Sequence, residues 1–184
     1  LIFVFSLATA HSQSIIDYFI PDSPKNTSVF EAHNIGMNKV ESTREVKHIE
    51  GKEYQIITSN NDMFIRNSIR ITDTEILWYK HYSSNNLGLS NRQDYEPPIV
   101  LLKLPERKKE VAWSYTLNNV EYDCTASFTK IKALDSKREA IRVEQTKQGK
   151  TNIVWFVKGI GLWKNEQVME DGSTRAWLTF LRME

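Results

Sequence analysis

A strict alternation of apolar and polar residues along residues 111–128 constrains the fold more than any other feature of this sequence. The apolar or aromatic positions of its two runs are Val111, Trp113, Tyr115 and Leu117, and then Tyr122, Cys124, Ala126 and Phe128. A period of two is typical of half-buried β-strands. Asn118-Asn119, between the runs, tolerates the positive φ angles of a tight turn. The segment therefore predicts a β-hairpin over 111–130.

Further β-rich runs are separated by turn residues, in the rhythm of an antiparallel meander. We expect additional strands at 54–58, 65–71, 75–82, 99–104, 140–145, 152–158 and 160–168. Helix signals are scarce: a short helix is expected at 12–19, closed by Pro21, and 132–139 is expected to be a turn or loop. The sequence predicts an all-β fold with minor α content, a single curved antiparallel sheet or half-barrel built as a meander with at most one or two short helices.

The stretch VWFVKGIGLWK, residues 154–164, contains two glycines, Gly159 and Gly161. A dinucleotide-binding loop would need a third glycine three residues later, where Lys164 stands, and a helix behind it. Glycine within a strand pattern usually marks a bulge, a bend or a close backbone approach. We therefore expect a structural turn at Gly159 and Gly161, with Gly159 at positive φ and Gly161 leaving room for an aromatic neighbour.

The first residues, LIFVFSLATAHSQS, have the form of the end of a secretion signal. Cleavage after Ala10 or after Ser12 would fit, and a buried N-terminal strand is the alternative. We expect 1–12 to be a signal-peptide remnant and 13–184 to be a single antiparallel β domain. The protein is then exported, and either periplasmic or secreted. The apolar run is too short to span a bilayer, so no transmembrane segment is expected.

Charge and cysteine content exclude several classes of function. The 24 basic and 23 acidic side chains give a net charge of +1, which does not indicate nucleic-acid binding. Cys124 is the only cysteine, so an intrachain disulfide is impossible, which fits a bacterial periplasm. Cys124 lies mid-strand, where a thiol is usually a small core residue.

No catalytic constellation, metal site or cofactor motif is recognisable. The four histidines lie far apart in sequence, at His11, His33, His48 and His81. Acid pairs such as Glu121 with Asp123, and Asp94 with Glu96, are typical of solvated strand faces, although paired acids also serve glycoside hydrolysis. The sequence favours a noncatalytic protein, with a secreted hydrolase whose acids converge in a cleft as the alternative.

Aromatic residues on the predicted strands are the candidates for ligand binding. They are Trp78, Trp113, Tyr115, Tyr122, Phe128, Trp155 and Trp163. A curved sheet with an aromatic concave face makes a pocket for lipid, sugar or peptide. The same residues equally serve as core, and the sequence leaves both interpretations open.

A resemblance rests on the segment from 98 to 167. Leu104-Pro105, then Ala112-Trp113-Ser114-Tyr115, and later VWFVKGIGLWK resemble motifs of exported bacterial β-proteins of unknown function, many from the Bacteroidetes. Arg107-Lys108-Lys109-Glu110 departs from the pattern where a glycine is usual, and Trp155-Phe156 replaces a tyrosine-rich strand. The architecture of that group is similar to the half-barrel of periplasmic lipoprotein carriers. The resemblance implies a carrier or binding role, with a hydrophobic small molecule or an envelope protein as partner.

Overall fold

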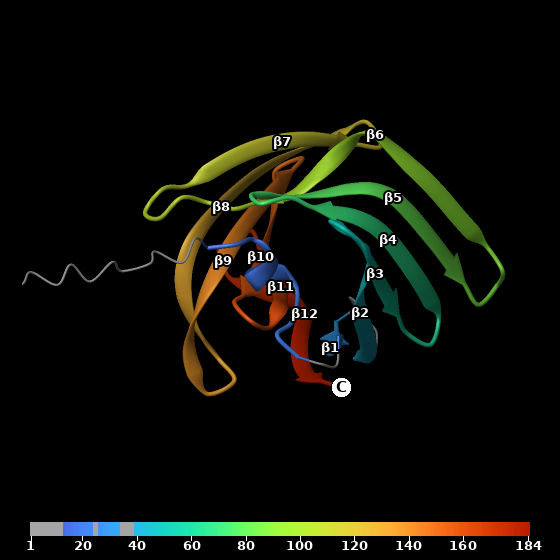
Figure 1. The fold of residues 1–184 in the computed structure, drawn as a ribbon, viewed down its shortest axis with the longest axis horizontal. Helices are drawn as coiled ribbons and strands as arrows, with labels where there is room; N and C mark the ends of the chain where they lie inside the picture. The colour runs from blue at the N-terminus through green and yellow to red at the C-terminus, as the bar shows by residue number, and fades with distance from the viewer. Residues whose placement is uncertain (1–12, 24–25, 34–38) are drawn as a thin grey trace, which may run out of the picture.

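The computed structural model describes residues 13–23, 26–33 and 39–184. The expected signal segment, 1–12, lies outside the described residues. Twelve antiparallel strands form one strongly curved sheet that nearly closes into a barrel (Figure 1). This confirms the predicted all-β meander.

The elements follow one another through short connections. Their bounds are α1 Ile16–Phe19, β1 Thr27–Ala32, β2 Val40–Glu50, β3 Glu53–Ser59, β4 Met63–Ile71, β5 Glu75–Asn85, β6 Ser90–Lys103, β7 Val111–Leu117, β8 Val120–Ala133, β9 Ser136–Lys147, β10 Lys150–Val157, β11 Gly161–Val168 and β12 Thr174–Met183.

The strand order is β6-β5-β4-β3-β2-β1-β12-β11-β10-β9-β8-β7. Every neighbouring pair joins strands that are consecutive in the chain, except β1 and β12, whose pairing unites the two halves of the sheet. The two edge strands, β6 and β7, have no backbone ladder between them. Instead the Trp113 indole Nε1 donates a hydrogen bond to the Val100 carbonyl across the seam, at 2.9 Å.

Three two-residue turns explain the regularity of the hairpins. Asn118-Asn119, Leu134-Asp135 and Gln148-Gly149 each have positive φ at both residues. This geometry matches the right-handed twist of the flanking strands and gives tight, in-register hairpins. The predicted hairpin at 111–130 is therefore present, and β8 continues to Ala133. The turn or loop expected at 132–139 consists only of Leu134-Asp135, because β8 ends later and β9 begins earlier than the sequence predicts.

The β10–β11 turn packs against α1. Gly159 has a φ of 75° and Gly161 one of 84°. The Gly159 N–H donates to the Asp17 carbonyl at 2.8 Å, and a Cβ added at Gly161 would lie 2.8 Å from the Phe19 carbonyl oxygen. The close neighbour of Gly161 is thus the backbone of an aromatic residue rather than its ring.

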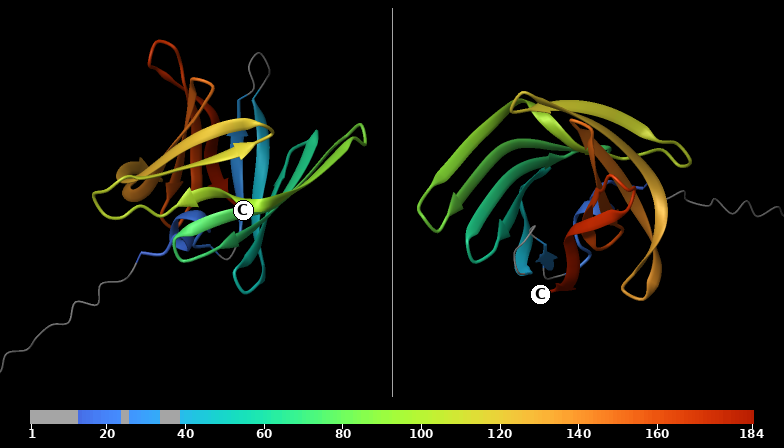
Figure 2. Two further views of the ribbon diagram at one scale, coloured as in Figure 1. Left: turned by 90° about the horizontal axis from the view of Figure 1, so that it is seen from above. Right: turned by 180° about the vertical axis from the view of Figure 1, so that it is seen from behind.

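Helix α1 lies inside the curve of the sheet and fills one end of the barrel (Figures 1 and 2). Ile15, Tyr18 and Phe19 are almost fully buried. The Tyr18 ring packs against Phe128 with centroids 5.6 Å apart, and the Phe19 ring packs against Phe156 at 5.8 Å. We call the sheet face that α1 covers the inner face, and this end of the barrel the plugged end.

The plugged end contains the main core. Its buried residues beyond α1 come from both halves of the sheet, and they are Ile56, Ile69, Ile71, Ile76, Leu102, Ala126, Ile141, Val143 and Phe156. A second, smaller cluster surrounds the β10–β11 turn, where Ile160 and Val157 meet Phe180 and Phe30. Both clusters are apolar, so the fold is held together at this end chiefly by hydrophobic burial.

The sequence did not predict four stretches of strand. They are β1, β2, the first half of β6 and β12. Pro97-Pro98 lies inside β6 rather than between strands. No helix among the described residues has the length and apolar character needed to cross a membrane.

Candidate functional site

The candidate site is the inner face at the end of the barrel opposite α1. The turns at 148–149 and 169–173 lie at this end, whereas α1 lies at the other (Figure 2, left). Several inner-face side chains here are half-buried, among them Trp78, Tyr95, Tyr115 and Tyr122, whereas Cys124 and Ser42 are buried. We call this part of the barrel the open end.

Cross-strand register determines which side chains share the inner face. Residues directly opposite on antiparallel neighbours point to the same side. Phe128 contacts α1, so Tyr122 and Cys124 on the same strand also face inward, and so do their partners Tyr115 and Trp113 on β7. Trp78, Trp113 and Phe128 all pack against the main core. Five of the seven candidate aromatic residues, Trp78, Trp113, Tyr115, Tyr122 and Phe128, therefore lie on one surface.

The other two candidates lie elsewhere. Trp155 sits between the inward-facing Val154 and Phe156 and points to the outer face. Its ring lies 5.7 Å from the Arg142 guanidinium and 5.1 Å from the Lys164 ammonium, and its Nε1 donates to Glu166 Oε2 at 2.8 Å. Trp163 stacks on Phe180 with centroids 5.2 Å apart, within the second cluster. These contacts give both tryptophans a structural role.

One wall of the open end combines an aromatic pair with amide and imidazole groups. Trp78 packs edge-on against Tyr95 at 4.5 Å and against His81 at 5.7 Å. His81 Nδ1 is hydrogen-bonded to Asn67 Oδ1 at 2.8 Å, and the Tyr95 hydroxyl donates to Gln93 Oε1 at 3.3 Å. Burial lowers the pKa of His81 and raises that of Tyr95. The imidazole is therefore favoured in its neutral form.

The adjoining wall, across the β6–β7 seam, is built on β7, β8 and β9. The rings of Tyr115 and Tyr122 stack at 4.8 Å. Gln145 Nε2 donates to the Tyr115 hydroxyl at 2.7 Å, and Lys147 Nζ donates to the Tyr122 hydroxyl at 3.1 Å. Burial raises the pKa of Tyr115 well above its usual value, and raises that of the Cys124 thiol to about 11. Cys124 is thus protonated at neutral pH and unsuited to nucleophilic catalysis.

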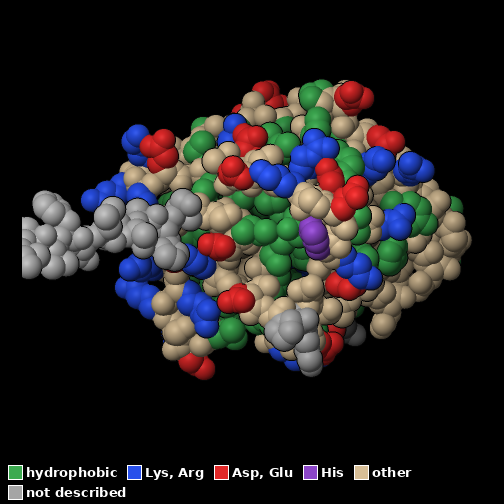
Figure 3. Space-filling view, in the orientation of Figure 1, with side chains coloured by type: hydrophobic (Ala, Val, Ile, Leu, Met, Phe, Trp, Pro, Cys, Tyr) green, Lys and Arg blue, Asp and Glu red, His purple; other side chains and the backbone are tan. Residues whose placement is uncertain are grey.

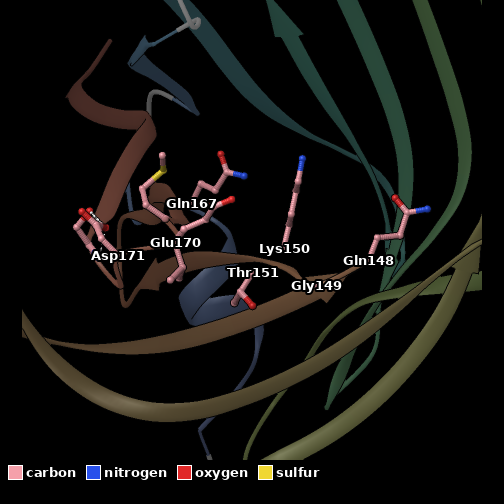
Figure 4. Close-up of a pocket in the computed structure, with 10 residues that line it drawn as sticks. Gln148, Gly149, Lys150, Thr151, Gln167, Glu170 and Asp171 are labelled. Atoms are coloured by element: carbon pink, nitrogen blue, oxygen red, sulfur yellow. Dashed lines mark hydrogen bonds between the residues drawn. The ribbon is translucent and has the colours of Figure 1, made fainter.

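At the rim, a hollow of about 760 Å³ separates the β9–β10 turn from the β11–β12 turn. Figure 4 shows Lys150 extending from the strand into open space, with Gln167 and Glu170 beside it. Lys150 stands directly opposite Lys147 on β9. These side chains make this part of the rim polar.

Among the described residues, the acid pairs predicted from the sequence do not converge inside the barrel. Glu121, Asp123, Asp94 and Glu96 are exposed. Every carboxyl group whose pKa is clearly shifted is shifted downward, and hydrogen bonds from neighbouring groups contribute in each case: Glu53, Asp73, Glu106 and Asp171. Within the described residues, no group of three or more His, Cys, Asp or Glu side chains could hold a metal ion. The hydrolase alternative stays a hypothesis from sequence.

Asn67, His81, Gln93, Tyr95 and Gln145 were missed as site residues. A signal for them exists in the sequence, because Asn67 interrupts the alternate apolar row of Ile65 and Ile69. A polar residue in a core-facing row needs either a polar partner or solvent, and both occur at an open barrel end.

Comparisons with known proteins give little further information. No protein-family model matches this sequence, and no curated protein matches it. Among solved structures, a crystal structure described as a "putative lipoprotein" from Parabacteroides distasonis is similar, with 8% identity and a TM-score of 0.44. The match covers 91% of this chain and 98% of that one. A likeness this weak does not establish a shared family or function.

Proposed function

We propose that this is an exported, noncatalytic β-protein that binds a hydrophobic small molecule, such as a lipid or acyl chain, at the open end of the barrel. The observation that carries the proposal is the half-buried aromatic surface formed by Trp78, Tyr95, Tyr115 and Tyr122 on the inner face. Side chains usually fill the interior of an eight-stranded barrel, whereas wider barrels enclose space for ligands. This sheet has twelve strands, and the fully buried side chains of α1 pack at one end of it, which supports a ligand site at the other.

The ligand enters by displacing water from the aromatic walls, and burial of its apolar surface supplies the binding free energy. The amide, imidazole and hydroxyl groups on the same walls orient its polar part. No chemical step is required, which agrees with the protonated thiol of Cys124 and the exposed acids.

A titration with N-phenyl-1-naphthylamine, an uncharged fluorescent probe of apolar sites, tests this proposal. We expect saturable one-site binding that weakens about tenfold in Trp78→Ala, because the ring forms part of the inner wall. Trp155→Ala is the matched control, since it removes the same side chain from the outer face and should leave the affinity unchanged. Non-saturable binding, or equal losses in the two variants, would refute an interior site.

Export is supported by the pattern of residues 1–12 and needs a separate test. The intact mass of protein recovered from cells that carry the complete gene should correspond to a mature chain that begins at His11 or Gln13. A recovered chain that retains residues 1–10 would contradict removal of a signal.

A further inference from the structure

Arg44, on the inner face of β2, is a buried cation without a counter-ion. Its side chain is only 7% exposed. Within the described part of the chain it forms no hydrogen bond and no ion pair; its one recorded polar interaction is with the Phe19 ring, whose centroid lies 4.9 Å from the guanidinium carbon. Burial lowers the pKa of Arg44 to about 10, so the group remains charged at neutral pH.

Such an arrangement is unfavourable in the unliganded protein. A charge that is largely buried without a protein counter-ion costs more free energy than a contact with one aromatic ring returns. Buried arginines are therefore normally paired with carboxylates or with a bound anion. Among the described residues, no carboxylate pairs with the Arg44 guanidinium.

Its immediate neighbours are hydroxyl groups and apolar side chains, not acids. Ser28 on β1 and Thr58 on β3 stand directly opposite Arg44 and share its face. The nearest acids on β2, Glu41 and Glu45, alternate to the outer face, where Glu41 pairs with Arg182 and Glu45 with Lys47. Ser28 Oγ donates to Met183 Sδ at 3.3 Å, so the Thr58 hydroxyl is the donor left for an anion, and no carboxylate of β2 shares the inner face with Arg44.

The position of Arg44 relates this charge to the candidate site. Val46, two residues toward the plugged end, is fully buried, and its partner Ile56 belongs to the main core. In the other direction the inner row continues through Ser42 toward the open end. Arg44 thus lies between the α1 plug, which it contacts through Phe19, and the part of the inner face that leads to the open end.

We propose that Arg44 binds the anionic head of an amphiphile, a carboxylate or phosphate monoester, whose apolar chain lies on the aromatic inner face. The inference rests on the proposed function and specifies its ligand class. Carboxylate and phosphate oxygens accept two parallel hydrogen bonds from one guanidinium, and the hydroxyl of Thr58 adds a donor beside it. A small hydrated ion would leave the surrounding apolar surface uncovered, whereas an amphiphile covers it with its chain.

Displacement of the naphthylamine probe by decanoate, decyl phosphate and 1-decanol at neutral pH tests the inference. The three ligands share a ten-carbon chain and differ in the head group. Comparison of decanoate with decyl phosphate also distinguishes a fatty acid from a phosphate-bearing lipid as the ligand. We expect the wild-type protein to bind at least one of the anions ten or more times more tightly than decanol. In Arg44→Gln this preference should disappear while the affinity for decanol is retained.

Arg92→Gln is the matched control, because it removes one exposed positive charge from β6 and should preserve the preference. Equal affinities for all three ligands, or an anion preference that survives in Arg44→Gln, would overturn the role of Arg44 and leave the proposed function standing. Failure of all three to displace the probe, or to bind in calorimetry, would overturn both.

The unliganded protein gives an independent readout. Replacing an unpaired buried charge by an apolar side chain of similar length should raise stability, so Arg44→Met is expected to melt about 3 °C or more above the wild type. Addition of the preferred anion should raise the melting temperature of the wild type and leave that of Arg44→Met unchanged. A lower melting temperature for ligand-free Arg44→Met would mean that Arg44 is already satisfied within the fold, and would contradict the inference.

Discussion

The two ends of the barrel are built from the same strands but stabilised differently. At the plugged end, α1 brings Ile15, Tyr18 and Phe19 into a core of aliphatic side chains, and these three side chains are at most 2% exposed. At the open end the same inner face carries Trp78, His81 and Tyr95 together with amides, and these side chains stay half-buried. One end therefore supplies stability, and the other carries the surface for which we propose a binding role. Figure 3, which views the molecule as in Figure 1, shows hydrophobic side chains gathered at its centre and charged groups around its margin.

This difference suggests that binding and folding can be altered separately. Natural binding sites often retain groups that are unfavourable for the unliganded fold, and compensate for them elsewhere. In this molecule the compensation comes from the short helix, whose four residues contact both halves of the sheet. The following substitutions test that division, beginning with the largest expected effect.

Phe19→Ala should destabilise the protein by about 3–5 kcal/mol, because it removes a buried ring that packs on Phe156 and leaves a cavity. Tyr95→Ala, at the open end, should cost about 1–2 kcal/mol, because the ring is already partly hydrated. Urea unfolding followed by circular dichroism gives both values. Similar losses at the two positions would contradict the separation of a stability end from a binding end.

Gly161→Ala should cost about 2–3 kcal/mol. The new Cβ would meet the Phe19 carbonyl oxygen at 2.8 Å and would also have to adopt a φ of 84°. Gly149→Ala is the matched control, since Gly149 has a φ of 74° but no atom within 4 Å of an added Cβ. It should cost only about 1 kcal/mol. Equal losses would show that the contact with α1 does not matter and that only the backbone angle does.

His81→Gln should produce the smallest change, in the pH dependence of stability. Burial lowers the pKa of His81 in the folded protein below the unfolded value of about 6.5. The unfolded chain therefore binds the proton more readily, and stability is lost as the pH falls from about 7 toward 5. Urea midpoints measured across this range should fall less steeply in His81→Gln than in the wild type.

The sequence predicts the fold best where alternation and turn chemistry agree. Residues 111–130 combine a strict period of two with Asn118-Asn119, and the hairpin is found there. Strand β1 is not predicted, because its sequence does not alternate between apolar and polar residues. Ser28, Val29 and Phe30 are buried in succession, so both faces of the strand are covered. Its partner β12 is distant in sequence, and no local pattern specifies that pairing.

The candidate site is predicted only in part, for a related reason. Alternation places Trp113, Tyr115, Tyr122 and Phe128 on one face, but it cannot show which part of that face α1 covers. Trp155 illustrates the limit, because aromatic character alone does not distinguish the inner face from the outer one. In the sequence, Arg44 is one polar residue in a strand that mixes polar and apolar residues. It becomes a buried charge only because the sheet curves around it.

The pairing of β1 with β12 also has a consequence for the time course of folding. All other ladders are hairpins whose partners are separated by a few residues, so they can form early and independently. The β1–β12 ladder, which joins Phe30 to Phe180, must wait until nearly the whole chain is available. We therefore expect two curved half-sheets to form first. The β1–β12 ladder then joins them in one late step, and the rate of that step sets the rate of folding.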